Sequence, residues 1–125
     1  MPLIHLDDLE SEYVTPKYSS AFGELVLGER IEVGRLRFEA DEGAVEHAHP
    51  QEQVMIVISG RLQVELEGVA GELGPGEGFH APPNVPHKVT ALQDTVVLSC
   101  KDVIGGIGHK MAPGETDRLQ QLGKA

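Results

Sequence analysis

Glycine and proline recur so often along this chain that long helices are excluded from its middle. The 125 residues include 15 glycines and 8 prolines, and from Gly23 to Pro86 these return every few positions. Each costs a helix interior about 1 kcal/mol or more, so no helix of about twelve residues can form there. Many short strands between turn signals instead predict an all-β fold, a small antiparallel β-barrel or jelly roll. The predicted strands cover residues 22–27, 30–40, 44–49, 52–59, 61–67, 87–92 and 95–103.

The predicted strands differ in how their two faces should be covered. Residues 61–67 alternate apolar and polar side chains, which is typical of a strand with one face in water. Residues 54–58 are apolar at every position, so both faces of that strand should be covered. The second cover would come from a second copy of the chain, which we favour, or from residues 1–18 folding back. In the 30–40 run the apolar residues change phase at Gly34, which predicts a β-bulge.

Charge and composition narrow the class of protein. The formal net charge of -10 argues against binding to nucleic acid or to an anionic membrane. The single Cys100 excludes an internal disulfide, and no apolar run is long enough for a transmembrane helix. The N-terminal residues are acidic where a secretory signal would be basic, so we expect a cytoplasmic protein. At this length we expect one domain over 1–125, with a barrel core at about 20–104, an arm at 1–18, a tail at 105–125 and a short helix at 115–122.

A group of histidines has the spacing of metal ligands. His47 and His49 lie two residues apart on a predicted strand, so their imidazoles share one face. Gln53 has the same parity on the following strand, whereas Glu52 has the opposite parity and should point away. With His87 from a later strand, three imidazoles and one amide oxygen would suit one divalent ion. We expect three ligands from two adjacent strands and the fourth from across the barrel. The plainer alternative is a solvated histidine pair on an edge strand.

Two longer stretches carry a family resemblance. The segment GAVEHAHPQEQVMIVISG resembles the first motif of the cupin superfamily, and LGPGEGFHAPPNVPH resembles the second. The resemblance covers roughly Ile31 to Asp102 and implies a small metal-binding barrel. The chain departs from the usual motifs in three places: the short spacing from Gly43 to His47, Gln53 in place of the metal-binding Glu, and Ala91 in place of an Asn.

One cupin subgroup is particularly similar. The run HAHPQEQ followed by PPNVPH looks like the small single-domain cupins related to the uronate-ketonising enzymes of pectin and alginate breakdown. That resemblance implies a ligand set of His, His, Gln and His, and a proton-donating Asp on the last barrel strand. Here the matching residue is Asp102. The subgroup continues with an aromatic residue where this chain reads DVIGGIG, so the substrate does not carry over.

These observations predict a metal-dependent enzyme. Neutral ligands leave a divalent ion (Zn, Ni, Mn, Fe or Co) its full charge, which attracts small, anionic, oxygenated acids. The leading interpretation is non-redox isomerisation or tautomerisation, with the metal as Lewis acid and Asp102 as proton donor. A metal-dependent dioxygenase and a non-catalytic sugar-binding or small-molecule-binding cupin are the alternatives. We also expect a homodimer, solvent-exposed His5 and His109 in the termini, and His80 packed at a corner.

Overall fold

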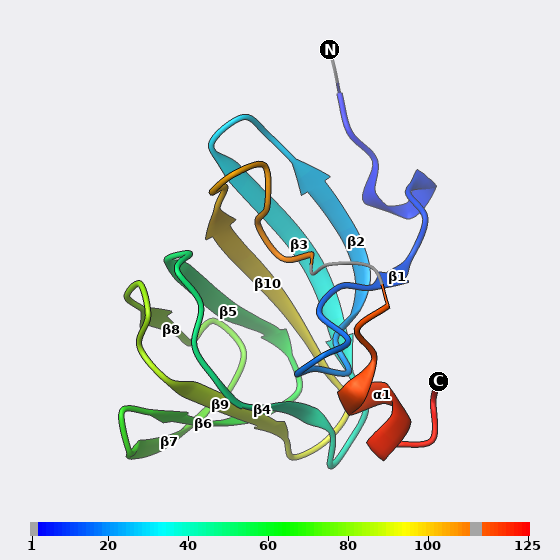
Figure 1. Cartoon of the computed structure of the whole chain (residues 1–125). Coiled ribbons are helices and arrows are strands. Elements are labelled where there is room, and N and C mark those ends of the chain that lie inside the picture. Colours follow the sequence, from blue (N-terminus) through cyan, green and yellow to red (C-terminus); the bar gives the residue numbers. More distant parts are fainter. Residues whose placement is uncertain (1–2, 111–113) are drawn as a thin grey trace.

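The computed structural model describes residues 3–110 and 114–125, and these form an almost purely β structure (Figure 1). The all-β prediction is confirmed. The described strands are β1 (Glu12–Tyr13), β2 (Phe22–Leu27), β3 (Ile31–Phe38), β4 (Gly43–His47), β5 (Gln53–Ser59), β6 (Leu62–Leu66), β7 (Val69–Leu73), β8 (Gly78–Ala81), β9 (His87–Ala91) and β10 (Thr95–Asp102). A short 3-10 helix, η1 (Leu6–Asp8), precedes them and the helix α1 (Asp117–Gln121) follows them.

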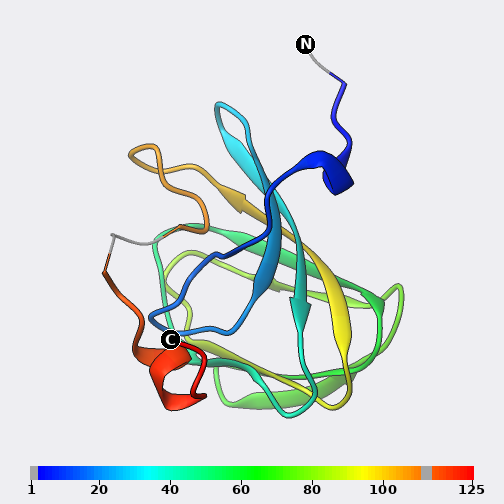
Figure 2. The same ribbon diagram turned by 90° about the vertical axis from the view of Figure 1, so that its right-hand side faces the viewer.

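The strands form two antiparallel sheets that enclose the core between them (Figure 2). One sheet has the order β1-β2-β3-β10-β5-β8 and the other has the order β4-β9-β6-β7. Sequential strands β4 and β5 belong to different sheets, so the segment between them crosses from one sheet to the other. This crossing is one reason why residues that are close in sequence face each other across the interior.

Alternation along the strands sets which side chains enter the core. On β5 the side chains of Gln53, Met55 and Val57 are buried, whereas those of the intervening residues are exposed. On β10 the buried positions are Thr95, Val97, Ser99 and Lys101. The fully buried aliphatic side chains Leu36, Leu62, Val57 and Val97 come from both sheets and form the centre of the core.

The β-bulge expected at Gly34 is absent, because β3 pairs in continuous register with both β2 and β10. The change of apolar phase in this strand has another cause. Ile31 and Val33 lie on the outer face, and Leu36 and Phe38 lie on the inner face. Both faces of β3 therefore carry apolar side chains without any break in the strand.

The outward face of β5 is not covered by the N-terminal arm. Val54 and Ile56 are each 39% exposed and Ile58 is 54% exposed. The arm instead pairs through β1 with β2, at the other end of the same sheet. Residues 3–18 therefore do not supply the alternative cover, and the outer apolar face of β5 is left exposed by the described residues.

The remaining elements lie at the edges and the C-terminus. The helix α1 falls inside the predicted range 115–122 and packs Leu119 into the protein. Strands β7 and β8 were not predicted, since β7 is largely exposed and β8 is only a few residues long. Among residues 3–110 and 114–125, no helix is both long and apolar enough to cross a membrane.

Candidate metal centre

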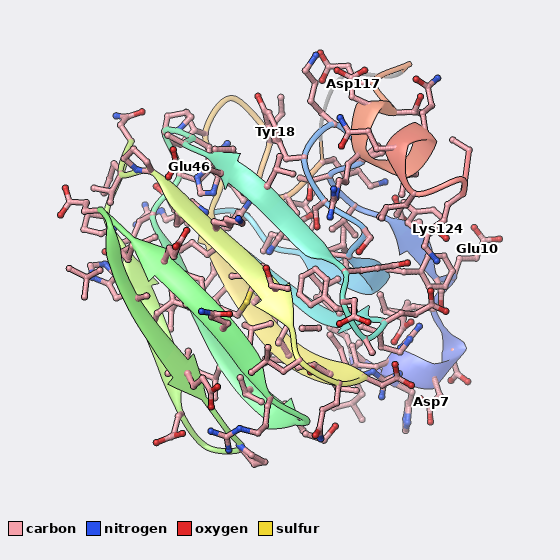
Figure 3. The ribbon with its side chains drawn as sticks, turned by 90° about the horizontal axis from the view of Figure 1, so that it is seen from below. Asp7, Glu10, Tyr18, Glu46, Asp117 and Lys124 are labelled. Atoms are coloured by element: carbon pink, nitrogen blue, oxygen red, sulfur yellow. The ribbon has the colours of Figure 1, made fainter. Side chains whose placement is uncertain are left out.

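Three histidines converge at one end of the barrel. His47 ends β4, His49 follows it in the crossing segment, and His87 begins β9 directly opposite His47. Their ligand atoms all lie within 4.8 Å of one another. The ring of Tyr18 stacks on that of His47 with centroids 4.8 Å apart, and Figure 3 places Tyr18 beside the end of β4. This aromatic contact holds the imidazole in place from the outer side of the cluster.

The backbone fixes the same tautomer in all three rings. The Nδ1–H of His47 donates to the carbonyl oxygen of Val45 at 2.7 Å. That of His49 donates to Gln51 at 2.9 Å, and that of His87 donates to Val85 at 2.9 Å. A carbonyl can only accept, so Nδ1 carries the proton and Nε2 keeps a free lone pair. The Nε2 of His87 is buried and has no hydrogen-bond partner among the described residues. An orphaned buried acceptor is costly in an ordinary interior, and it fits a metal ligand.

Gln53 completes the set from the facing sheet. Its Oε1 lies 3.2 Å from Nε2 of His49, although neither atom has a proton to share. Two acceptors facing each other in this way fit a common cation between them. The predicted parity of Gln53 is right. We expected Gln53 on a strand adjacent to that of His47, with His87 across the barrel, but His47 and His87 lie on adjacent strands and Gln53 faces them from the other sheet.

A buried chain of hydrogen bonds orients the Gln53 amide. Its Nε2 donates to the Ser99 hydroxyl at 2.9 Å, and that hydroxyl lies 2.8 Å from Nε2 of His109. The Nδ1–H of His109 donates to Glu32 at 2.7 Å, which leaves its Nε2 to accept the Ser99 proton. Every donor thus points the same way, toward Glu32, and the Gln53 oxygen is turned toward the histidines.

His109 was expected at the surface, and this is wrong because it is only 2% exposed. Its backbone N–H also donates to Glu32, at 2.6 Å, so the segment after β10 folds back into the end of the barrel. The polar partners that hold it, Glu32 and Ser99, lie far from it in sequence. No local pattern around His109 signals this position.

The electrostatics of the site favour neutral histidines. Burial lowers the pKa of both His47 and His49 to about 4, and burial also lowers the pKa of His87. The three rings are therefore neutral and ready to bind a cation at pH 7. Burial raises the pKa of Glu32, but hydrogen bonds from His109 outweigh this and hold the pKa below its usual value. The Glu32 carboxylate is thus ionised, yet it is separated from Gln53 by three hydrogen bonds in series.

A cavity leads from the protein surface to the cluster. It has a volume of about 360 Å³, and its lining includes His47, His49, Tyr18, Lys101 and Gly108. That volume is in the range of small-molecule sites. A second hollow of about 360 Å³ lies near the other ends of β3 and β10, and Lys124 and its partners Glu39 and Glu42 are part of its lining. Its lining contains none of the three clustered histidines.

Other predicted residues lie outside the cluster. Asp102 lies on the outward side of β10, out of phase with Ser99 and Lys101, and its carboxylate accepts the backbone N–H of Glu52 at 2.6 Å. The structure does not bring Asp102 to the histidines, so its role in proton transfer stays a prediction. Glu52 points away from the ligands as its parity predicts. It pairs at 2.6 Å with His80, which is half exposed and not packed at a corner as expected.

The fold and the site together define the class: a double-sheet β-barrel with a histidine cluster at one end that could hold a metal ion. The chain belongs to the cupin family, since residues 34–103 match the family model described as Cupin domain. None of the curated proteins compared with the chain matches it.

Solved structures share this fold. The structure of KdgF from Halomonas sp. has a TM-score of 0.72 and 24% identity, covering 82% of this chain and 93% of that one. The polyketide cyclase RemF from Streptomyces resistomycificus has a TM-score of 0.74 and 19% identity, covering 98% of this chain and 93% of that one. An RmlC-like cupin from Shewanella frigidimarina has a TM-score of 0.69 and 21% identity, covering 77% and 85%. At these identities the likeness extends to the fold alone.

Proposed function

We propose that this cupin is a metal-dependent enzyme that isomerises or tautomerises a small oxygenated acid without redox change. His47, His49, His87 and Gln53 would hold one divalent ion. When bound, the ion supplies a Lewis acid that stabilises negative charge on a substrate oxygen. The resemblance of HAHPQEQ and PPNVPH to the uronate-ketonising cupins supports this type of reaction, whereas the likeness to KdgF supports the fold and not a particular substrate.

The observation that carries the proposal is the absence of a carboxylate from the described ligand cluster. The described metal-ligating group consists of three histidines, and Gln53 adds a neutral amide. Such a set does not offset the charge of a divalent ion, so an anionic substrate is attracted more strongly than in a site with a carboxylate ligand. The ligand rings are also already neutral at pH 7, because burial holds the pKa of His47 and His49 near 4.

Metal analysis tests the ligand set first. The protein should be purified without a His tag or chelators, and it should carry one divalent ion per chain. Replacing His49 by Ala should remove the ion and leave a folded β protein, since His49 belongs to no strand and to no part of the core. The matched control is His80→Ala, which removes a half-exposed histidine outside the cluster and should keep the ion. Full occupancy in His49→Ala would contradict the proposed site.

Turnover tests the reaction class. The metal-loaded protein should be assayed with unsaturated monouronates and 2-oxo acids, with and without oxygen. We expect conversion that does not depend on oxygen and that is lost in His49→Ala. A strict need for oxygen would identify a dioxygenase instead. Saturable binding without conversion would identify a binding protein.

A further inference from the structure

Lys101 is a buried lysine that shares a cavity with His47 and His49, and none of the acidic groups described in the structure forms an ion pair with it. The residue is 5% exposed, and its side chain faces the interior from β10. It lines the cavity that reaches the histidines from the surface, and it also lines a narrower space whose lining includes Gln53 and His109. The side chain thus stands at the base of the site, on the sheet that faces His47 and His87.

Three lysines near the chain termini form ion pairs with carboxylates, whereas Lys101 forms none with the described residues. Lys17 pairs with Asp117, Lys110 with Glu12, and Lys124 with Glu39 and Glu42. No carboxylate of the described residues lies within ion-pair distance of Lys101. Glu32 is the acidic group that acts on it, and Glu32 already receives the side chain and backbone N–H groups of His109. An ammonium left unpaired in an interior is costly unless a ligand supplies its counter-charge.

The ammonium group of Lys101 acts on the cluster. Burial lowers the pKa of Lys101, and the Glu32 carboxylate opposes this effect. The positive charge of Lys101 lowers the pKa of His47, His49 and His87 beyond the effect of burial. Lys110 and Glu115 also line the surface cavity. Lys110 pairs with Glu12, so the Glu115 carboxylate remains as an opposing charge on the cavity wall, although it does not lie within ion-pair distance of Lys101.

We infer that the Lys101 ammonium binds the carboxylate of the ligand while another oxygen of the same molecule reaches the histidine centre. This inference rests on the proposed function and deepens it. It assigns the ligand to the small acids that carry a carboxylate and a second oxygen function, of a size that a cavity of about 360 Å³ accepts. Lys101 is thereby the residue that selects acids over uncharged sugars or ketones.

Calorimetric titration of the metal-loaded protein tests the inference with matched probes. The acids are galacturonate, glucuronate and pyruvate, and the uncharged counterparts are galactose, glucose and pyruvamide. Wild type should bind at least one acid more tightly than its counterpart. Lys101→Met should bind that acid about tenfold or more weakly, bind the uncharged probe as before, and keep one ion per chain. The control Lys110→Met lines the same cavity but pairs with Glu12, and it should stay within about twofold of wild type.

A further variant and the contrary outcomes of the titration separate this inference from the proposed function. Lys101→Arg keeps the charge and should keep the preference for acids, so it serves where Lys101→Met does not fold. Equal acid binding in Lys101→Met and wild type overturns the inference, as does wild-type protein that holds the ion and binds none of the acids. Loss of the ion from Lys101→Met also overturns it, because Lys101 would then support the metal centre instead. A wild-type protein that binds no ion contradicts the proposed function, which metal analysis detects separately.

Discussion

At the scale of single residues, the direction of each hydrogen bond decides what the site can bind. Carbonyl oxygens that take the Nδ1 protons leave three Nε2 lone pairs facing one point. The same logic applies to Gln53, where Ser99 takes the amide N–H and leaves the amide oxygen toward His49. Outer partners of this kind commonly set the orientation and strength of metal ligands. The site is therefore built as much by Ser99 and the backbone as by the ligands.

Replacing Ser99 by Ala should weaken metal binding and leave the ligands in place. The change removes the acceptor of the Gln53 amide and the donor to His109, so the amide is free to rotate. We expect metal affinity to fall about tenfold to a hundredfold, measured by competition with a chromogenic chelator. Cys100→Ala is the matched control, because that neighbouring side chain lies on the other face of β10. Unchanged affinity in Ser99→Ala would show that the chain of hydrogen bonds does not support the centre.

Parity along a strand predicts whether a side chain points into the barrel only when the inward face of that strand is known. Gln53 and Glu52 were assigned correctly: Gln53 has the parity of Met55 and Val57, which fill the core, and Glu52 has the opposite parity. On β10 the polar residues Ser99 and Lys101 have the inward parity, whereas Leu98 and Cys100 face outward. The family resemblance pointed to Asp102, which has the parity of Leu98 and Cys100. Lys101 has the opposite parity, so it was not among the predicted site residues.

At the scale of elements, hydrogen bonds and ion pairs around Glu24 connect the N-terminal arm to the outer face of β2 and β3. Glu24 is 2% exposed and accepts hydrogen bonds from Arg35 at 2.6 Å, Arg37 at 2.8 Å and Ser11 at 2.6 Å. Arg35 also contacts Asp7 in the arm at 2.7 Å. The hydrogen bonds from Arg37 and its neighbours hold the pKa of Glu24 down to about 2. These arginines therefore bind a carboxylate of the protein itself, outside the barrel.

Replacing Glu24 by Gln should lower stability in a way that depends on pH. A carboxylate whose folded pKa lies below its unfolded value of 4.5 stabilises the protein above pH 4.5, and this stabilisation disappears as the pH falls to about 2. At pH 7 we expect a loss of about 2 kcal/mol, less than the full shift implies because both guanidinium groups are partly exposed. Urea unfolding at several pH values measures it, with the exposed Glu10→Gln as control. A loss of equal size at pH 2 and pH 7 would contradict this account.

The strands were predictable because alternation and turn residues are local signals. The predicted run 22–27 matches β2 at both ends, and most other runs differ from the observed strands by one or two residues. The order of the strands within the sheets was harder to predict from the sequence. The segment between β4 and β5 contains Pro50 and has no signal that separates a hairpin from a crossing between sheets. That distinction decides whether Gln53 joins His47 from the same sheet or from the facing one.

At the scale of the whole molecule, an acidic protein must concentrate its positive charge to bind an acid. The formal net charge of -10 repels small anions, but this long-range effect is screened over about 8 Å at physiological salt. Inside the cavity the buried Lys101 is screened much less than surface carboxylates. We therefore expect the local charge of Lys101 to outweigh the effect of the net charge on a bound acid.

The outer face of β5 and β10 carries several aliphatic side chains that the described residues leave exposed. Val54, Ile56 and Ile58 project from β5, and the partly exposed Val96 and Leu98 lie on the same side of the neighbouring β10. Adjacent aliphatic side chains in water are uncommon on single-chain proteins and typical of interfaces between subunits. The arm does not reach them, since β1 lies beyond β2 and β3 in the sheet. We propose that a second copy of the chain covers this face.

Changing Ile56 to Lys tests this pairing. Wild type should sediment at micromolar concentration as a species of twice the 13.5 kDa chain mass. Burying each of these side chains contributes about 1.5–3 kcal/mol at most, and a two-fold interface buries each of them twice, so a charge at its centre should give folded monomers. Val69→Lys introduces the same charge at an exposed residue of β7, in the other sheet, and should leave the dimer intact. A monomeric wild type would refute the pairing, and so would an Ile56→Lys protein that stays dimeric.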